Sequence, residues 1–264
     1  MTYENGMPMF EFLKIKLPNF VREEKGNAKC QNPNHKEYEA VFNIFDDGSR
    51  KCATVCPECQ KEERLRELKR EEARKIQHCK DCNIEPEFYG KTFNDFICKT
   101  ETQKDALAAA REMLSGKIGK LVLLGSYGTG KTMLASILAD LLDGKIYSMY
   151  EISTMIRQSY SPKAEKSELD IVNELASIPF LAIDEVGRTN GSAAEKNWLS
   201  YILDKRHVRK LPFVLISNGH LRRNCPKNGC DKCFENYMDG DVISRLRQDS
   251  KIINIIGEDF RAGK

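Results

Sequence analysis

From about residue 79 onward, short apolar runs alternate with segments whose apolar residues recur at helical spacing. The apolar runs are continuous, which is typical of strands buried on both faces of a parallel sheet. They are KLVLLG (120–125), KIYSMY (145–150), PFLAIDE (179–185), PFVLISN (212–218) and KIINIIG (251–257). The predicted helices lie at 102–116, 131–143, 151–160, 167–177 and 193–207. The pattern therefore predicts an α/β domain over 79–264, with a parallel sheet flanked by helices.

The first 78 residues lack this alternation. Residues 1–60 are rich in cysteine and in turn-forming residues, and we interpret them as a small separate module. KEERLRELKREEARKIQ (61–77) places a few leucines and an isoleucine on a mostly charged helical pattern. We expect a charged linker helix at 61–78, which either spaces two domains or faces a partner.

Composition narrows the choice of partners and compartment. The 264 residues carry 42 basic and 39 acidic side chains, for a formal net charge of +3. This near balance excludes a polycation, so any nucleic-acid site is a local patch. No apolar stretch reaches the ~18 residues of a transmembrane helix, and the N-terminal MTYENGMPMF lacks the shape of a signal peptide. We expect a cytoplasmic protein without a membrane partner.

A glycine-rich segment follows the first predicted strand of the α/β domain. GSYGTGKT fits the pattern G-x-x-x-x-G-K-[ST], in which backbone N–H groups and a helix N-terminus surround phosphates. Lys131 is expected to reach the β- and γ-phosphates of ATP, and the Thr132 hydroxyl to hold Mg²⁺. The residues assigned to nucleotide binding are Gly125, Ser126, Tyr127, Gly128, Thr129, Gly130, Lys131, Thr132 and Met133.

Polar residues end two of the other predicted strands. PFLAIDE supplies Asp184, expected to order Mg²⁺ and its waters, and Glu185, expected to orient and polarise the attacking water. PFVLISN ends with Asn218, which either contacts the γ-phosphate or the attacking water, or is a hydrogen-bonding loop residue. Together with the phosphate loop, these residues predict an ATPase.

These motifs resemble AAA+ P-loop ATPases and, within them, the bacterial helicase-loader family of the DnaC and DnaI type. The resemblance covers about 79–264 and is carried by GSYGTGKTMLASILA, LAIDEVG, VLISN, SMYEISTMIRQSY, YGKTFNDF and DVISRLRQDSKIINIIGEDFR. It implies that Asn218 is the sensor-1 residue and Arg261 a sensor-2-like arginine. It also implies that Arg245 is the arginine finger offered to a neighbour's ATP, with Arg247 as a competitor. Such a finger raises hydrolysis by ~10³–10⁵-fold, so activity is expected to depend on assembly.

The chain after Arg245 is too short for a helical lid. Only 19 residues remain, part of them reads as a strand, and a lid needs several helices of ~11–12 residues each. We therefore expect a site without a C-terminal lid, closed instead by self-association across the bound ATP.

Ten cysteines in a chain without an export signal favour metal thiolates over disulfides. Cys30-x4-His35 and the later group Cys52, Cys56 and Cys59 form two knuckles around a predicted hairpin, in a zinc-ribbon-like arrangement. HKEYE…CPEC resembles the zinc module that precedes the ATPase domain in several loader relatives. The resemblance implies Zn²⁺ bound by Cys30, His35, Cys56 and Cys59, with Cys52 as an alternative to His35.

A second cysteine group departs from the family pattern, which is shorter at this point and usually lacks cysteines. It follows the strand PFVLISN and contains His220, Cys225, Cys230 and Cys233. We interpret it as a second zinc knuckle that braces an insertion, with His220 as the least certain ligand. A further pair, Cys79 and Cys82, either completes a site with Cys52 and His78 or holds no metal.

Two loops between the ATPase motifs combine basic and aromatic residues that suit single-stranded DNA. One carries Arg157 and Tyr160, and the other carries Ser192 and Lys196. The alternative for each of these residues is a solvated helix face.

The resemblance predicts that the chain is an ATP-dependent helicase loader. By resemblance, residues 1–78 contact a hexameric DnaB-type replicative helicase, which the ATPase domain delivers onto single-stranded DNA during replication initiation. One alternative is an IstB-like transposition helper ATPase that acts on duplex DNA. Another is an adaptor that binds ATP without hydrolysing it, which Glu185 argues against.

Overall fold

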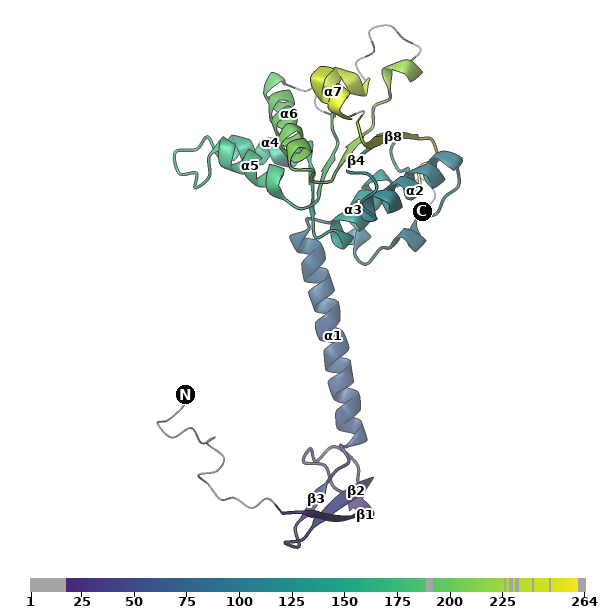
Figure 1. The fold of residues 1–264 in the computed structure, drawn as a ribbon, viewed down its shortest axis with the longest axis vertical. Helices are drawn as coiled ribbons and strands as arrows, with labels where there is room; N and C mark the ends of the chain where they lie inside the picture. The colour runs from purple at the N-terminus through teal and green to yellow at the C-terminus, as the bar shows by residue number, and fades with distance from the viewer. Residues whose placement is uncertain are drawn as a thin grey trace. The chain divides into compact units, whose positions relative to one another are not determined.

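The computed structural model describes residues 18–188, 192–225, 227, 230, 233–238, 240–246 and 248–260. The chain divides into two compact units, of which one ends at Ala73 and the other begins at Arg74 (Figure 1). Among the described residues, no helix has an apolar run long enough to cross a membrane.

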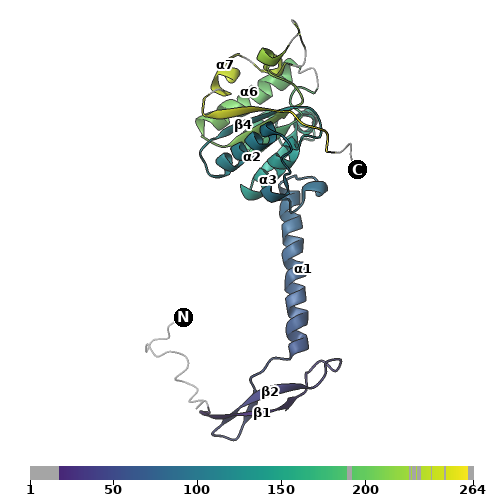
Figure 2. The same ribbon diagram turned by 90° about the vertical axis from the view of Figure 1, so that its right-hand side faces the viewer.

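The first unit contains a three-stranded antiparallel sheet in the order β1-β2-β3 (Figure 2). Its strands are β1 (Phe20–Ala28), β2 (Tyr38–Phe45) and β3 (Arg50–Cys52). The last two form the hairpin expected between the two cysteine knuckles. Only three hydrophobic residues of the described part of this unit are buried, namely Ala28, Ala40 and Cys56.

The predicted charged helix is present as α1 (Pro57–Asp81) and is longer at both ends than expected. Pro57 suits the first helical position, because its missing N–H has no partner there. Glu58 follows in the first turn, and His78 and Lys80 lie in the last, as the helix dipole favours. Of the side chains of α1, only Cys79 is buried.

The second unit contains the predicted parallel sheet, in the order β5-β6-β7-β4-β8 with every neighbouring pair parallel. Its strands are β4 (Lys120–Gly125), β5 (Lys145–Ser148), β6 (Leu181–Asp184), β7 (Phe213–Ser217) and β8 (Ser250–Ile255). The strand expected over 145–150 stops at Ser148, because the Ser148 side chain caps the next helix by accepting from Glu151 N–H.

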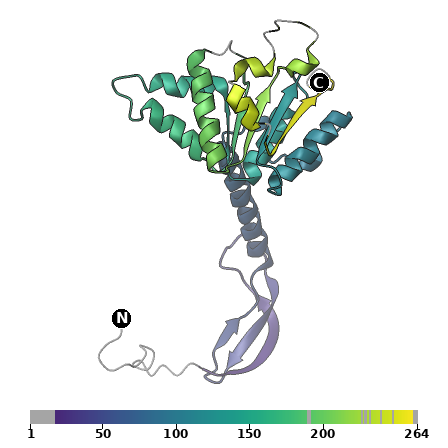
Figure 3. The same ribbon diagram turned by 45° about the horizontal axis from the view of Figure 1, so that its top comes forward.

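Helices cover both faces of this sheet (Figure 3). Val122 and Leu124 of β4 belong to one hydrophobic core, whereas Leu121 and Leu123 belong to the other. The first core packs against α4 (Met149–Gln158), α5 (Glu168–Ser177), α6 (Ala193–Val208) and α7 (Gly240–Leu246). The second packs against α2 (Glu101–Leu114), α3 (Lys131–Leu141) and the end of α1. Four α-helices of this unit begin with complete capping boxes, at Thr100, Ser148, Ser167 and Ser192.

Short 3₁₀ turns complete the chain. They are η2 (Pro86–Phe88), η3 (Phe93–Asp95), η4 (Arg222–Asn224) and η5 (Phe234–Tyr237). The described residues after β8, 256–260, form no helix.

Candidate nucleotide site and metal clusters

The glycine-rich loop leaves the carboxyl end of β4 and enters α3. Gly125 has a φ of 128°, and a Cβ there would lie 2.1 Å from the Ile255 carbonyl oxygen of β8. Gly130 has a φ of 92°, and a Cβ there would lie 2.5 Å from the Phe96 ring. Both positions therefore require glycine, and the loop can curl tightly in front of the α3 N-terminus.

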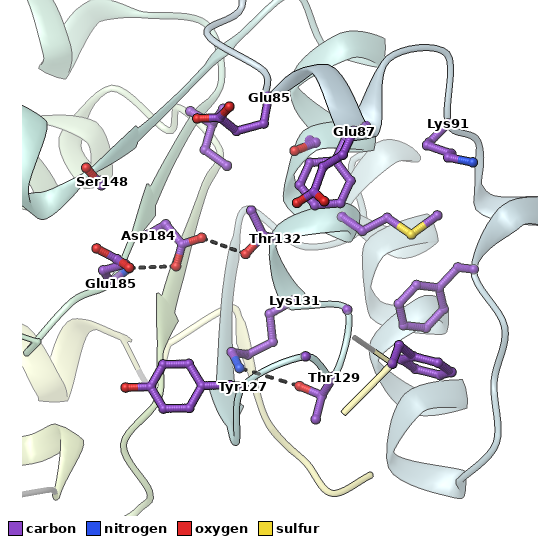
Figure 4. A pocket seen from close by; sticks show the side chains of 18 of the residues that line it. Glu85, Glu87, Lys91, Tyr127, Thr129, Lys131, Thr132, Ser148, Asp184 and Glu185 are labelled. Carbon is purple, nitrogen blue, oxygen red and sulfur yellow. Dashed lines mark hydrogen bonds between the residues drawn. The ribbon is translucent and has the colours of Figure 1, made fainter. Parts of the chain in front are cut away.

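Lys131 and Thr132 occupy the first turn of α3 and turn toward the loop and the neighbouring strands. The Lys131 ammonium donates to the carbonyl oxygens of Gly125 at 2.9 Å and Ser126 at 2.6 Å. The Thr132 hydroxyl donates to Asp184 Oδ2 at 2.7 Å, which joins the phosphate loop to the end of β6 (Figure 4). A cation and two oxygen ligands thus converge where the motif predicts a nucleotide.

The turn after β6 holds Glu185 in an unusual backbone conformation. Its φ is 58°, a left-handed value that a non-glycine residue adopts only under constraint. Its N–H donates to Asp184 Oδ1 at 2.6 Å. The next residue is fixed to β7, because Val186 N–H donates to the Ile216 carbonyl at 2.9 Å and the Ser217 hydroxyl donates to the Val186 carbonyl at 2.6 Å. Glu185 itself pairs with Arg188.

Residues 127–132, Asp184 and Glu185 line a cleft with a volume of about 780 Å³, whereas Gly125 and Ser126 are not among its lining residues. Asn218 lines it from the end of β7, and Met133 lines it from α3. One wall, formed by residues of 83–97, was not among the predicted site residues; Figure 4 labels Glu85, Glu87 and Lys91 on it. Pro86 and Gly90 do signal turns in this segment, but only the folded chain brings it against Gly130.

The residues present fit a magnesium nucleotide. Mg²⁺ prefers oxygen ligands, and the Thr132 hydroxyl and the Asp184 carboxylate provide two of them within hydrogen-bond distance of each other. Gly125 and Gly130 leave no side chain at the positions where backbone N–H groups have to approach phosphates.

The predicted arginine finger contacts its own chain. Arg245, in α7, pairs with Asp204 of α6. The end of α7 is fixed by buried Lys120, whose ammonium donates to the carbonyls of Arg245 at 2.8 Å and Gln248 at 3.0 Å. Burial lowers the pKa of Lys120. Arg247 and Arg261 lie outside the described residues.

The four predicted DNA contacts have different surroundings. Arg157 is exposed at the end of α4, and Tyr160 is 60% exposed with its hydroxyl bonded to Glu168, which raises the tyrosine pKa. The Ser192 hydroxyl accepts from Glu195 N–H as the cap of α6. The Lys196 ammonium donates to the Asn236 carbonyl at 2.7 Å. Ser192 and Lys196 thus have contacts within the chain.

The first unit brings together the four side chains implied as zinc ligands. One ligand atom from each of Cys30, His35, Cys56 and Cys59 lies within 4.8 Å of the others. His35 Nδ1 is 3.4, 3.6 and 3.3 Å from the sulfurs of Cys30, Cys56 and Cys59. Ligands of a tetrahedral zinc ion, with bonds of ~2.0–2.3 Å, are separated by about 3.3–3.8 Å. The cluster therefore fits Zn²⁺.

The other ring nitrogen of His35 is also held. Its Nε2 is 3.0 Å from Glu62 Oε1, and this carboxylate raises the pKa of His35 to about 9. A carboxylate behind a ligating histidine orients the ring and is a common second layer of zinc sites. Asn32 N–H, which donates to the Cys30 sulfur at 3.4 Å, lowers the pKa of that thiol to about 7.

A second cluster lies in the loop between β7 and α7. It contains His220, Cys225, Cys230 and Cys233, with one ligand atom of each within 4.8 Å of the others. His220 Nε2 is 3.6 Å from the Cys230 sulfur and 3.7 Å from the Cys233 sulfur. The structure therefore gathers the four side chains that the spacing had grouped.

The remaining cysteines are arranged differently. Cys52 is exposed, and its thiol donates to the Thr54 carbonyl at 3.2 Å outside the first cluster. Cys79 and Cys82 are buried in the core beneath α3, and burial raises the pKa of the Cys82 thiol to about 11. His78, Cys82 and Asp143 also approach one another, but Asp143 is exposed and Cys79 and Cys52 are not part of this group.

Comparison with known proteins gives a consistent picture. The family model "IstB-like ATP binding protein" matches residues 66–264, about three quarters of the chain. A replicative helicase loader, DnaC of Escherichia coli (strain K12), is 30% identical over 146 residues, which are 52% of this chain and 59% of that protein. The chain thus spans less than two thirds of that relative's length.

Two solved structures have the same fold as the second unit. The crystal structure of the DnaC helicase loader superposes with a TM-score of 0.53 at 16% identity, covering 65% of this chain and all of that one. The replication initiator DnaA bound to AMPPCP and single-stranded DNA superposes with a TM-score of 0.52 at 17% identity, covering 66% of this chain and 51% of that one. At these identities the likeness shows the AAA+ fold alone.

Proposed function

This chain belongs to the IstB-like ATP binding protein family, and from that membership we propose that it is an ATP-dependent replicative helicase loader. The observation that carries the nucleotide part is the Thr132–Asp184 hydrogen bond across a cleft bounded by the glycine loop. The loading part is supported by the similarity to a relative named as a replicative helicase loader.

ATP binds in the cleft with its phosphates on the loop. Lys131 then exchanges the loop carbonyls for the β- and γ-phosphates, a charge-assisted contact that is stronger than the one it leaves. Thr132 and Asp184 would hold Mg²⁺, which would supply neutralisation of phosphate charge.

Hydrolysis requires a positioned water, and Glu185 is placed to orient it. Glu185 lines the cleft from a left-handed turn, and the two hydrogen bonds of Val186 to β7 keep this turn in place. Arg188 pairs with Glu185 in this structure, and this ion pair has to break before the Glu185 carboxylate can contact the water. Asn218, also in the cleft, contacts the γ-phosphate or the water.

Arg245 completes the site of a neighbouring copy. On its own chain it pairs with Asp204, so assembly would exchange this carboxylate for the neighbour's phosphates. Because an arginine in trans contributes ~10³–10⁵-fold to hydrolysis, the activity depends on self-association. Arg261 is assigned the sensor-2 role by family resemblance alone.

The first unit, with zinc held by its cluster, binds a DnaB-type helicase. Among the residues of the second unit with solvent-facing side chains, Arg157 and Tyr160 provide a cation and a stacking surface for single-stranded DNA. The DnaA structure with bound single-stranded DNA supports a DNA role for this fold. Nucleotide state then couples the helicase to the DNA.

A retention experiment tests the proposal. The immobilised protein is incubated with a DnaB-type replicative helicase in the presence of ATP or ADP. We expect retention that differs between the two nucleotides for the natural chain and no nucleotide dependence for Lys131→Ala. Lys117→Ala, which removes an exposed lysine, is the matched control and keeps the natural behaviour. Absence of retention with either nucleotide would exclude the loader.

The second candidate is an IstB-like helper ATPase that acts on duplex DNA, and the name of the matching family favours it. Equilibrium binding to single- and double-stranded oligonucleotides of equal length separates the two. Preference for the duplex, together with no helicase retention, selects the helper.

A further inference from the structure

The loop between β7 and α7 is long for a connection inside a compact domain. It runs from Asn218 to Gly240, and in its described residues it contains only the two short turns η4 and η5 and a bridge between His220 and Cys233. Connections of this length without helices or strands are uncommon unless something else orders them. The four side chains of the second cluster are distributed along this loop.

We infer that His220, Cys225, Cys230 and Cys233 bind a structural Zn²⁺ ion. Three thiolates and one imidazole form a soft ligand set that selects zinc over Mg²⁺ or Ca²⁺. All four come from the protein, so no position is left open for substrate, as in structural rather than catalytic zinc sites. Cys230 and Cys233 have the two-residue spacing of a zinc knuckle.

Hydrogen bonds outside the cluster already shape the loop around the ion. Phe234 N–H donates to the His220 carbonyl at 2.9 Å, next to the His220–Cys233 bridge. Arg222 N–H donates to the carboxylate of Glu235, which joins η4 to η5. Asn236 Nδ2 donates to the Cys230 carbonyl at 2.7 Å. The ligands therefore approach one another through a built turn and not through chance proximity of free side chains.

The loop rests on the catalytic part of the second unit. Cys233 and Phe234 are buried, and Phe234 belongs to the core beneath α6. The ring of Tyr237 packs on Gly187, where a Cβ would come within 2.5 Å of it. Gly187 is two residues after Glu185, so the loop supports the turn that contains Glu185. Lys196 fastens the same loop to α6.

The position of the loop gives the ion a consequence, which rests on the proposed function. The loop begins directly after Asn218 and leads into α7, which carries Arg245. An ion that fixes the loop therefore fixes the distance between the sensor residue and the finger. Its loss is expected to lower ATP turnover while leaving ATP binding at Lys131 and Thr132 intact.

Zinc content of the purified full-length protein tests the site directly. We expect two zinc ions per chain, and one in each of the single variants Cys225→Ser, Cys230→Ser and Cys56→Ser. Cys56→Ser combined with Cys225→Ser leaves none. Cys98→Ser, which removes a half-buried cysteine outside both clusters, keeps two. Cys225 and Cys230 are both only partly buried, so a folded protein is expected for either variant.

Two results would overturn the site. One is a single zinc ion in the natural chain that Cys56→Ser removes, and the other is two zinc ions retained in Cys225→Ser. Because zinc content does not depend on ATP, helicase or DNA, this outcome is independent of the loader proposal. The consequence for the finger is measured separately, as ATP turnover against ATP affinity in Cys225→Ser.

Discussion

The two four-ligand clusters contain the same kinds of side chain in very different surroundings. Around the first, only Ala28, Ala40 and Cys56 are buried hydrophobic residues in the described part of the unit. Around the second, Phe234 joins a core that includes strands of the parallel sheet and four helices. The first cluster is therefore most of the interior of its unit, whereas the second fastens a loop to an interior that exists without it.

We therefore expect zinc to have a different role at each cluster. A small unit buries too little apolar surface to offset the conformational entropy of its chain, and metal binding of ~10–16 kcal/mol can supply what is missing. A large unit with two hydrophobic cores needs no such contribution to fold. There the ion fixes the position of nearby residues. Removing it should therefore lower ATP turnover more than it lowers the free energy of unfolding of the second unit.

Removing the first ion should have the largest effect. In Cys56→Ser we expect the sheet of β1, β2 and β3 to unfold, because the zinc contribution of ~10–16 kcal/mol is as large as the whole stability of an ordinary domain. Hydrogen exchange read by mass spectrometry should show β1 and β2 unprotected and β4 and β7 unchanged. Cys52→Ser is the control, with both regions protected. Protection of β1 and β2 after loss of the metal would contradict the comparison.

The second unit should depend on its own interior contacts and not on zinc, and a buried arginine tests this. Arg206 is fully buried in α6 and donates to the carbonyls of Leu175, Ile178, Pro179 and Pro212. Burial lowers the pKa of Arg206 to about 10. Arg206→Met leaves four carbonyls without this donor, so we expect the second unit to lose ~3–5 kcal/mol of unfolding free energy.

Urea unfolding monitored in the second unit measures this loss. The control is Arg209, three residues later, which is exposed and makes a single long hydrogen bond to the Ala176 carbonyl. Arg209→Met is expected to lower the unfolding free energy by less than ~1 kcal/mol. Equal effects of the two variants would show that the buried guanidinium does not hold the α5–β6 connection. Zinc content should stay unchanged in both.

The parts of the site that follow from neighbouring residues were predictable. The phosphate loop, β4 and the Asp184–Glu185 pair are signalled by residues adjacent in sequence. The structure places residues 127–132 and the pair on one cleft. The grouping of His220, Cys225, Cys230 and Cys233 followed in the same way from spacing. In the first cluster, the choice of His35 over Cys52 came from the family resemblance, and the structure groups His35 with the three cysteines. The exact end of β5 did not, because the cap at Ser148 competes with continuation of the strand.

Other features depend on contacts between distant segments. The wall at 83–97 reaches the phosphate loop only because α1 and α3 pack in one core. The pairing of Arg245 with Asp204 and the support of Gly187 by Tyr237 join residues about 40 and 50 positions apart, which no periodicity encodes. Ser192 looked like a loop residue for DNA, while its hydroxyl caps α6.

A smaller change sharpens the account of the first cluster. Glu62→Gln weakens the contact behind His35 without removing a ligand, so we expect zinc affinity to fall ~10–100-fold. Competition with a chromogenic chelator measures the affinity. Glu63→Gln changes the adjacent residue, which pairs with Arg66 and Arg70 on the surface, and should leave the affinity unchanged. A tenfold or larger effect confined to Glu62→Gln supports the ligand role of His35, and equal affinities would contradict it.

The smallest expected effect separates a helix cap from a DNA contact. Ser192→Ala removes the hydroxyl that accepts from Glu195 N–H, and Ser167→Ala removes the equivalent cap of α5. Because a lost N-cap costs ~1 kcal/mol, both variants should destabilise the second unit by a similar amount in urea. If Ser192 serves only as a cap, the two also bind single-stranded DNA equally, while Arg157→Ala binds less tightly. If only Ser192→Ala binds single-stranded DNA less tightly, Ser192 contacts the DNA. Loss of a helix cap alone would affect Ser192→Ala and Ser167→Ala equally.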